Sequence, residues 1–159
     1  MRVFLDTSVM LGGLIDLGPQ SAAAQRIMAA VAEGQVPDPG SAWHCCLEFY
    51  SVATRLPAEF RLKPVDAQRL LREEILARLA IADLPPGDRQ PLLDAAVQDG
   101  IGGGRIYDAH MAEIARAAGA RVIVTDNRRH FLAALRHGLK VETPAEFLAD
   151  LKKRLDALS

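Results

Sequence analysis

The chain has 159 residues, half of them hydrophobic and a quarter charged, which is the composition of one ordinary globular domain. Its 19 Lys and Arg nearly balance its 20 Asp and Glu, and a formal net charge of −1 excludes nucleic-acid binding through total charge, so such binding needs a local basic patch. No apolar run reaches the roughly 18 residues of a membrane span, and an acid at position 6 comes too early for a signal peptide, so we expect a cytoplasmic protein with no membrane partner.

The N-terminal part of the chain alternates between apolar runs and helical patterns. The run over 2–5 predicts a buried strand that stops at Asp6. Helical spacing follows over 9–15 and 21–33. Residues 36–38 predict a short second strand, although Pro37 has no N–H to donate to a sheet.

The rest of the chain is mostly helical. Ser41 is expected to be the N-cap of the next helix, and a glycine-rich loop over 100–104 precedes an alanine-rich one. The predicted elements are helices over 41–55, 65–79, 88–98 and 106–118, a strand over 122–124, a short helix near 129–136, a strand over 140–142 and a helix from Pro144. Strands separated by helices predict an α/β fold with a parallel sheet covered on both faces, and we expect a single domain over 1–159.

The two cysteines, Cys45 and Cys46, are adjacent and lie within an apolar helical pattern. No third cysteine exists to complete a zinc site or to form a second pair. Because free cysteine is often buried as a small hydrophobic residue, we expect both to belong to the core.

Two acids follow buried strands directly. Asp6 comes after the strand over 2–5, and Asp126 follows the strand over 122–124 by two residues. Ligands of open parallel sheets bind outside the carboxyl ends of the strands, so both acids are expected at that edge. The alternative for each is an Asp that caps a turn or a helix.

Two more acids lie on predicted helices. Asp108 shares a helix face with Ala112 and Ala115, a small-residue face expected to pack on the sheet, where an acid is costly unless it is paired or binds a metal. The alternative is an acid placed favourably near a helix start. Glu48 shares a stripe with His44, and this pattern fits a solvated face as well as a ligand.

Carboxylates that converge in a crevice can hold Mg²⁺, which takes oxygen ligands and keeps several waters. Such a metal orients and activates a water and neutralises charge on a transferring phosphoryl group. Close carboxylates also repel one another, so at least one of their pKa values should be raised when no metal is bound.

Four segments together resemble the PIN-domain nucleases, in particular toxins of the VapC type. They are Phe4-Leu5-Asp6-Thr7-Ser8, Leu47-Glu48-Phe49, Gly104-Arg105-Ile106-Tyr107-Asp108-Ala109-His110 and Val122-Ile123-Val124-Thr125-Asp126-Asn127-Arg128-Arg129-His130-Phe131. Their order and spacing cover residues 1 to about 148. The resemblance implies a three-layer sandwich with a central, mainly parallel sheet.

The same resemblance implies residue roles and partners. Asp6, Glu48, Asp108 and Asp126 become catalytic ligands of Mg²⁺, or of Mn²⁺ as a substitute, and the hydroxyls of Thr7, Ser8 and Thr125 orient them. Many relatives carry another acid close to the fourth, whereas here Asn127, Arg128 and Arg129 follow it. The number of metal ions bound, one or two, therefore stays open. The implied partners are RNA, a small antitoxin protein and a second copy of the chain.

Basic residues flank the proposed ligands. Arg105, Arg128 and Arg129 are their immediate neighbours and are expected to contact RNA phosphates, whereas the alternative is scattered surface arginines. The loop over 100–104 matches no phosphate-binding glycine motif and is expected to form a lip beside Asp108. The histidines share no metal-ligand spacing, although His44 lies within one helical turn of Glu48.

The predicted function is Mg²⁺-dependent hydrolysis of RNA by the toxin of a VapBC-type pair. A phosphatase of the haloacid-dehalogenase type also begins with an Asp after its first strand, but it needs a second Asp two residues on, where this chain has Ser8. Two alternatives stay open. One is an RNA-processing nuclease that is not a toxin, and the other is a PIN-like module that binds without cleaving.

Overall fold

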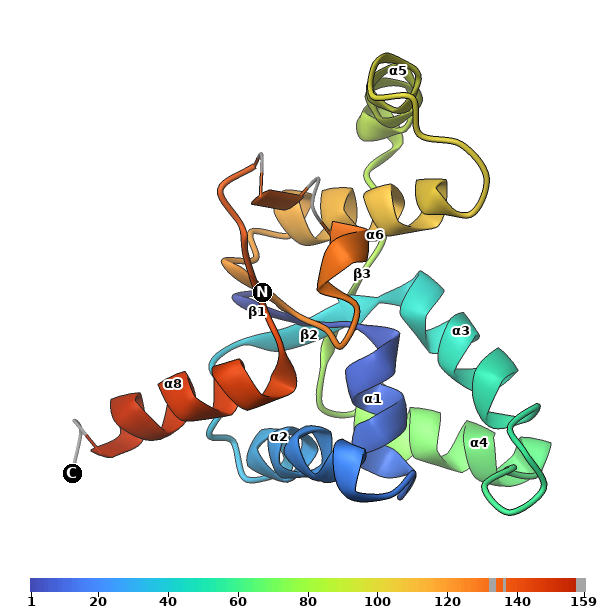
Figure 1. The fold of residues 1–159 in the computed structure, drawn as a ribbon, viewed down its shortest axis with the longest axis vertical. Coiled ribbons are helices and arrows are strands. Elements are labelled where there is room, and N and C mark those ends of the chain that lie inside the picture. The colour runs from blue at the N-terminus through green and yellow to red at the C-terminus, as the bar shows by residue number, and fades with distance from the viewer. Residues whose placement is uncertain (132–133, 136, 157–159) are drawn as a thin grey trace.

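The computed structural model describes residues 1–131, 134–135 and 137–156 (Figure 1). Within them, five strands form one sheet in the order β3-β2-β1-β4-β5, and every neighbouring pair is parallel. The strands are β1 (Val3–Leu5), β2 (Pro39–Ala42), β3 (Ala80–Ala82), β4 (Val122–Val124) and β5 (Lys140–Glu142). The prediction of an α/β fold with a parallel sheet is confirmed.

Helices cover both faces of this sheet. Figure 1 shows α5 and α6 on one side and α1, α2 and α8 on the other, which makes the three layers expected. The helices are α1 (Thr7–Leu14), α2 (Ala22–Ala32), α3 (Trp43–Ala53), α4 (Pro64–Leu70), α5 (Arg89–Gln98), α6 (Arg105–Ala117) and α8 (Pro144–Asp156). Among the described residues, no helix is both long and apolar enough to cross a membrane.

The second strand does not lie where the sequence predicted it. It covers Pro39–Ala42 instead of 36–38, and α3 begins only at Trp43. Ser41 is therefore part of the sheet and not an N-cap, and its buried hydroxyl donates a hydrogen bond of 2.7 Å to the carbonyl of Leu5. Close packing explains the small residues of this strand, since a Cβ at Gly40 would lie 2.6 Å from the carbonyl oxygen of Ala80.

The predicted helix over 65–79 is also corrected. The α-helix, α4, ends at Leu70, and a π-helical stretch over Leu71–Leu76 follows it directly. Next comes the strand β3, which the sequence pattern did not predict. Its three residues, Ala80–Ala82, pair with β2 at the edge of the sheet. Ala80 is exposed and the other two are only partly buried, so they carry no strong apolar signal.

Near the C-terminus, a 3-10 turn over Arg128–Phe131 lies where a short helix near 129–136 was expected. Part of that expected helix, residues 132–133 and 136, lies outside the described residues. The strand over Lys140–Glu142 and the helix from Pro144 are confirmed.

The core lies between the sheet and its helices and fixes the carboxyl edge. Phe4, Leu5, Ile123 and Val124 are fully buried on β1 and β4. Leu5 pairs with Val124, so the residues that follow, Asp6 and Thr125, meet at the same edge. Cys45 and Cys46 are buried as expected, and burial raises the pKa of the Cys45 thiol to about 12 and that of Cys46 to about 11.

Candidate active site

Asp6 is the most buried acid of the candidate site, with 5% of its surface exposed. Its Oδ2 accepts hydrogen bonds from Ser8 Oγ at 3.0 Å and from Thr125 Oγ1 at 2.7 Å. Although Asp6 precedes α1, its side chain makes no capping hydrogen bond, so the capping alternative does not explain its position. Burial raises the pKa of this carboxyl, and the two hydroxyls oppose that rise.

Glu48 lies on α3 and turns toward Asp6. Thr7 Oγ1 donates a hydrogen bond of 2.5 Å to Glu48 Oε2. The side chain is only partly exposed, whereas Ser51 and Arg55, which share its helical stripe, are exposed. The sequence pattern fitted Glu48 equally well to a solvated helix face and to a ligand position. Its hydrogen bond from Thr7 shows that the side chain faces the candidate site.

Asp108 lies on α6. His130 Nδ1 lies 3.5 Å from its Oδ2. Burial raises the pKa of the Asp108 carboxyl, and the negative charge of Glu48 raises it further, while His130 and Arg105 act in the opposite direction. An acid of the first α6 turn is thus partly buried beside another acid.

One hollow at the carboxyl edge of the sheet collects these groups, and we call it the acid hollow. Its polar lining residues are Asp6, Thr7, Ser8, His44, Glu48, Arg105, Tyr107, Asp108, Asn127 and His130. Asp126 does not line it. The Asp126 side chain is exposed beside it, burial still raises its pKa, and its backbone N–H donates to Ser8 Oγ at 3.1 Å. Three of the four predicted acids therefore share the acid hollow.

The acids of the hollow have the donor chemistry that Mg²⁺ requires. Among the residues that the structure describes, no three acidic, His or Cys side chains converge closely enough to hold a metal between them. Mg²⁺ is nevertheless usually bound through one or two carboxylates and keeps several waters. Glu48 lines the same hollow as Asp6 and Asp108, and its negative charge contributes to the raised pKa of both. The pKa values of Asp6 and Asp108 are raised, but burial is the main cause and the expected repulsion between carboxylates is a smaller one.

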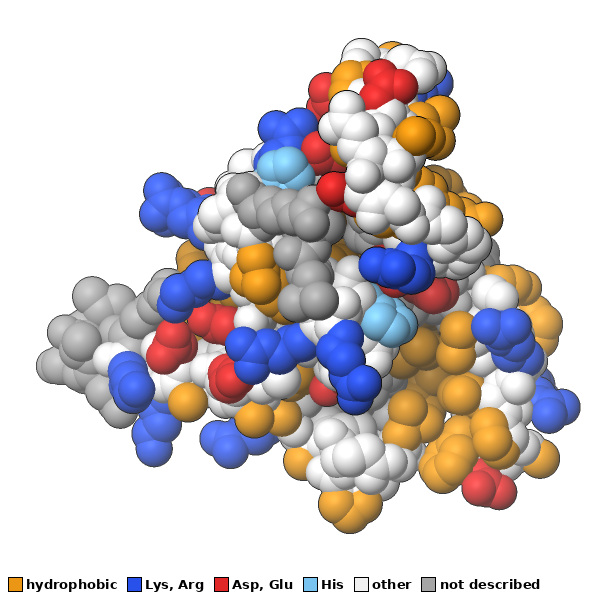
Figure 2. Space-filling view, turned by 45° about the horizontal axis from the view of Figure 1, so that its top comes forward, with side chains coloured by type: hydrophobic (Ala, Val, Ile, Leu, Met, Phe, Trp, Pro, Cys, Tyr) orange, Lys and Arg blue, Asp and Glu red, His pale blue; other side chains and the backbone are white. Residues whose placement is uncertain are grey.

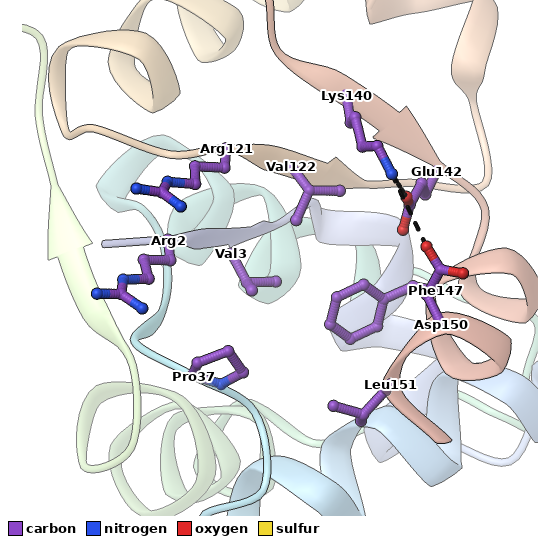
Figure 3. A pocket seen from close by; sticks show the side chains of 10 residues that line it. All are labelled: Arg2, Val3, Pro37, Arg121, Val122, Lys140, Glu142, Phe147, Asp150 and Leu151. Carbon is purple, nitrogen blue, oxygen red and sulfur yellow. Dashed lines mark hydrogen bonds and ion pairs between the residues drawn. The ribbon is translucent and has the colours of Figure 1, made fainter. Parts of the chain in front are cut away.

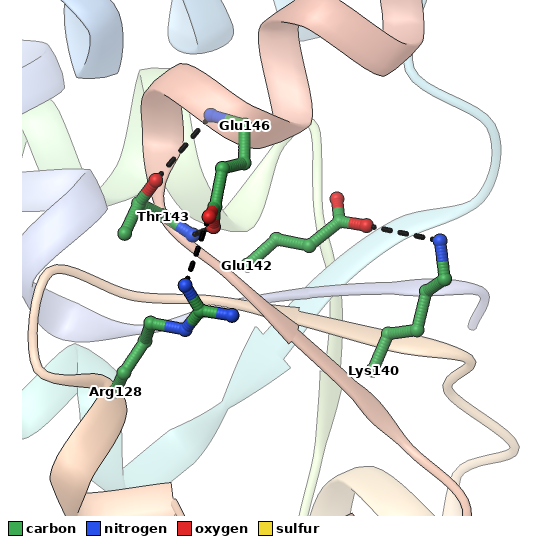
Figure 4. A network of polar contacts seen from close by, with 5 residues as sticks. All are labelled: Arg128, Lys140, Glu142, Thr143 and Glu146. Atoms are coloured by element: carbon green, nitrogen blue, oxygen red, sulfur yellow. Dashed lines mark hydrogen bonds and ion pairs between the residues drawn. The ribbon is translucent and has the colours of Figure 1, made fainter.

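The three predicted phosphate-binding arginines separate in the structure. Arg105 lines the acid hollow, whereas Arg128 and Arg129 do not. Figure 4 shows the Arg128 guanidinium turned toward α8, where its Nη1 lies 2.8 Å from Oε1 of Glu146. Glu146 also accepts a hydrogen bond from the backbone N–H of Thr143, so it belongs to the cap of α8.

Sequence reasoning missed three polar residues of the acid hollow, Tyr107, Asn127 and His130. The spacing of the histidines could reveal only those that bind one metal together, and His130 instead contacts an acid. The path of the chain after β4 is the signal that could have found it. Thr125 hydrogen-bonds Asp6, and the 3-10 turn that follows brings His130 to Asp108.

Comparisons with known proteins agree with this geometry. Residues 2–129 match a family model described as PIN domain. Ribonuclease VapC27 of Mycobacterium tuberculosis is 39% identical over 85 residues, which are 54% of this chain and 60% of that protein. The match thus spans about three fifths of the length of this curated relative.

Solved structures share the fold at low sequence identity. The crystal structure of PAE2754 from Pyrobaculum aerophilum has a TM-score of 0.63 at 20% identity and covers 96% of this chain and 90% of that one. VapBC2 from Rickettsia felis, bound to a DNA fragment from its promoter, has a TM-score of 0.62 at 18% identity, covering 90% of this chain and 98% of that one. The expected PIN-like fold is confirmed.

Proposed function

Because the chain belongs to the PIN-domain family, we propose that it is a Mg²⁺-dependent endoribonuclease and the toxin of a VapBC-type pair. One observation carries the proposal: Asp6, Glu48 and Asp108 come from three separate elements and line a single hollow at the carboxyl edge of a parallel sheet. The name of the relative Ribonuclease VapC27 supports RNA as the substrate.

The hydroxyls around the acids position them for this chemistry. Ser8 and Thr125 both donate to Oδ2 of Asp6, and Thr7 holds Glu48. A bound Mg²⁺, or Mn²⁺ in its place, would lower the pKa of an attacking water and neutralise charge on the phosphoryl group. Asp6, Glu48 and Asp108 would hold it, and Asp126 would join from the edge of the hollow. Fixed hydroxyl partners keep such carboxylates in one orientation, which is how outer residues support a metal site.

Arg105 is the residue best placed to hold the RNA backbone. It lies in the acid hollow, and its charge lowers the pKa of Asp108. A guanidinium there can bind a phosphate group through two parallel N–H···O hydrogen bonds, without taking part in bond breaking. Arg128 and Arg129 would contribute farther along the strand, Arg128 after leaving Glu146.

Protein partners are part of the same proposal. The neighbour VapBC2 supports an antitoxin partner, and we propose a homodimer in addition. Large apolar side chains are exposed on α3, namely Trp43, Leu47 and Tyr50. Figure 2 shows hydrophobic side chains gathered on the side of the molecule where α3 and α4 lie. Exposed apolar surface of this kind is typical of protein interfaces.

The deciding experiment measures cleavage of single-stranded RNA by the purified chain with Mg²⁺ and with EDTA. We expect cleavage only with the metal, and its loss in Asp108→Asn. RNA binding without cleavage at any Mg²⁺ concentration would indicate the non-cleaving module instead. Cleavage without growth arrest on expression, and without neutralisation by the product of a neighbouring short reading frame, would indicate an RNA-processing nuclease.

A further inference from the structure

A second hollow lies between α5 and α6, next to the acid hollow, and we call it the α5 hollow. Its walls include Leu92 and Leu93 of α5, and polar groups come from Asp83, Arg89 and His110. Tyr107 lines both hollows, so the two lie next to each other at this one side chain. Figure 1 shows α5 standing away from the sheet beside α6.

The Tyr107 ring is exposed yet held in place. More than half of the residue, 55%, is accessible to solvent. Its ring stacks on the ring of His44, with centroids 5.4 Å apart and planes 20° apart, and His44 in turn meets the edge of His110 at 5.9 Å. A ring supported in this way can offer its free surface to a ligand with little loss of side-chain entropy.

The composition of the α5 hollow matches a nucleobase. A base has a flat π face and a polar edge, and proteins that bind single-stranded nucleic acid stack bases on aromatic rings beside a cationic groove for the backbone. Tyr107 supplies the ring, the leucines an apolar wall, and Asp83, Arg89 and His110 both donors and acceptors. Arg105 and Asp108, two residues before and one residue after Tyr107, line the acid hollow where the phosphate would lie.

We propose that the α5 hollow binds one base of the RNA strand whose adjoining phosphate occupies the acid hollow, with Tyr107 as the stacking platform. The inference rests on the proposed ribonuclease function and adds to it a subsite that sets which nucleotide is presented to the acids. An apolar peptide is the other occupant that the leucines would admit. The polar edge groups and the position directly beside the acid hollow favour the base.

The test is an abasic scan of a short synthetic single-stranded RNA that the wild-type chain cleaves. Each nucleotide in turn is replaced by an abasic one, and affinity is measured in Ca²⁺, which replaces Mg²⁺ to suppress cleavage. We expect one position beside the cleaved bond at which loss of the base weakens wild-type binding by about tenfold or more, the usual worth of one stacked base. Tyr107→Ala should bind the intact RNA as weakly as the wild-type chain binds the RNA that lacks this base. Removing the base should not weaken binding by Tyr107→Ala any further.

Two variants separate stacking from a structural role. Tyr107→Phe keeps the ring and should restore binding. Val97→Ala removes an exposed apolar side chain of α5 that lines neither hollow, so it should bind like wild type. A wild-type abasic scan with no sensitive position would overturn the proposal and indicate that the α5 hollow serves a protein partner. Weakened Ca²⁺ binding by Tyr107→Ala would also overturn it, because the ring would then act by positioning Asp108. Failure of the wild-type chain to bind or cleave any RNA would instead reject the ribonuclease function.

Discussion

At the amino edge of the sheet, the cations Arg2, Arg121 and Lys140 surround a hollow with an apolar floor (Figure 3). Acidic partners accompany two of them: Arg2 Nε lies 3.2 Å from Asp38, and Lys140 Nζ lies 3.3 Å from Glu142. At the carboxyl edge, the buried carboxylate of Asp6 accepts hydrogen bonds from hydroxyl groups, and burial, with a smaller contribution from the charge of Glu48, raises its pKa.

The two edges differ in what their charges do for the fold. Exposed ion pairs such as Arg2–Asp38 contribute about 0–1 kcal/mol each and place little demand on the structure. An acid that is buried beside another acid works against folding until something neutralises it. This supports the proposal that the carboxyl edge binds a cation, whereas two of the three cations at the amino edge already have acidic partners.

The largest effect should follow from neutralising an acid at the carboxyl edge. Asp108→Asn removes one carboxylate from the acid hollow, and we expect Mg²⁺-dependent cleavage to fall roughly a thousandfold or more, because metal stabilisation of transition-state charge is worth several kcal/mol. Asp6→Asn should do the same. The matched control at the amino edge is Asp38→Asn, which should cleave like wild type. Full cleavage by Asp6→Asn would remove that residue from the proposed ligands.

A smaller effect is expected on metal affinity itself. Glu48→Gln keeps the size of the side chain and its hydrogen-bond acceptor for Thr7 but removes the charge that couples it to Asp6 and Asp108. We expect Mg²⁺ binding, measured by calorimetry, to weaken about 10–100-fold, the range found for groups that support a metal site. Glu59→Gln changes an exposed acid outside the acid hollow and serves as the control. Equal titrations for the two variants would return Glu48 to the solvated face.

Arg105 and Arg128 should differ in how much each contributes to the salt dependence of RNA binding. For Arg105→Ala in Ca²⁺, we expect a log–log slope shallower by about 0.7, the value for one phosphate contact with a single strand. The loss should be nearly uniform across sequences, because phosphate contacts do not distinguish bases directly. Arg128→Ala should change the slope only if RNA displaces Glu146 from the guanidinium. An unchanged slope for Arg105→Ala would take that residue off the phosphate path.

These experiments address a site whose acids were visible in the sequence but whose surroundings were not. Asp6 and Asp126 were placed at the carboxyl edge because each follows an apolar strand, and that reasoning depends only on strand order. Glu48 stayed ambiguous until the hydrogen bond from Thr7, 41 residues away, identified the face it uses. Contacts between distant segments have no local periodicity, so the sequence pattern could not supply them.

The fold shows the same division. The apolar runs of β1 and β4 were predicted because they are buried on both faces, where hydrophobicity is continuous. The strand β2 was misplaced because Gly40 and Ser41 are chosen for close packing and a buried hydrogen bond, not for strand propensity. The edge strand β3 was missed because three half-exposed residues give no pattern at all.

The comparison of the two edges also makes a prediction about stability without metal. Burial raises the folded-state pKa of Asp6 above its ordinary value, so folding favours its protonated form. Its stabilising contribution is complete below the ordinary pKa and is lost as pH rises through the raised one, which leaves the ionised group destabilising at neutral pH. In EDTA, Asp6→Asn should therefore resist urea better than wild type at neutral pH, and its advantage should shrink toward about pH 4, near the ordinary Asp pKa.

The matched substitution at the amino edge should have the smallest effect of all. Asp38→Asn removes the exposed ion pair with Arg2 and leaves the backbone carbonyl of residue 38, which accepts from the N–H of Arg2, in place. It also keeps a residue type that tolerates the positive φ of 44° at this position. We expect a loss of less than about 1 kcal/mol that disappears in high salt, because exposed ion pairs are weak and screened. A loss larger than this, or a destabilised Asp6→Asn at neutral pH in EDTA, would mean that the two edges do not differ in the way their burial and partners indicate.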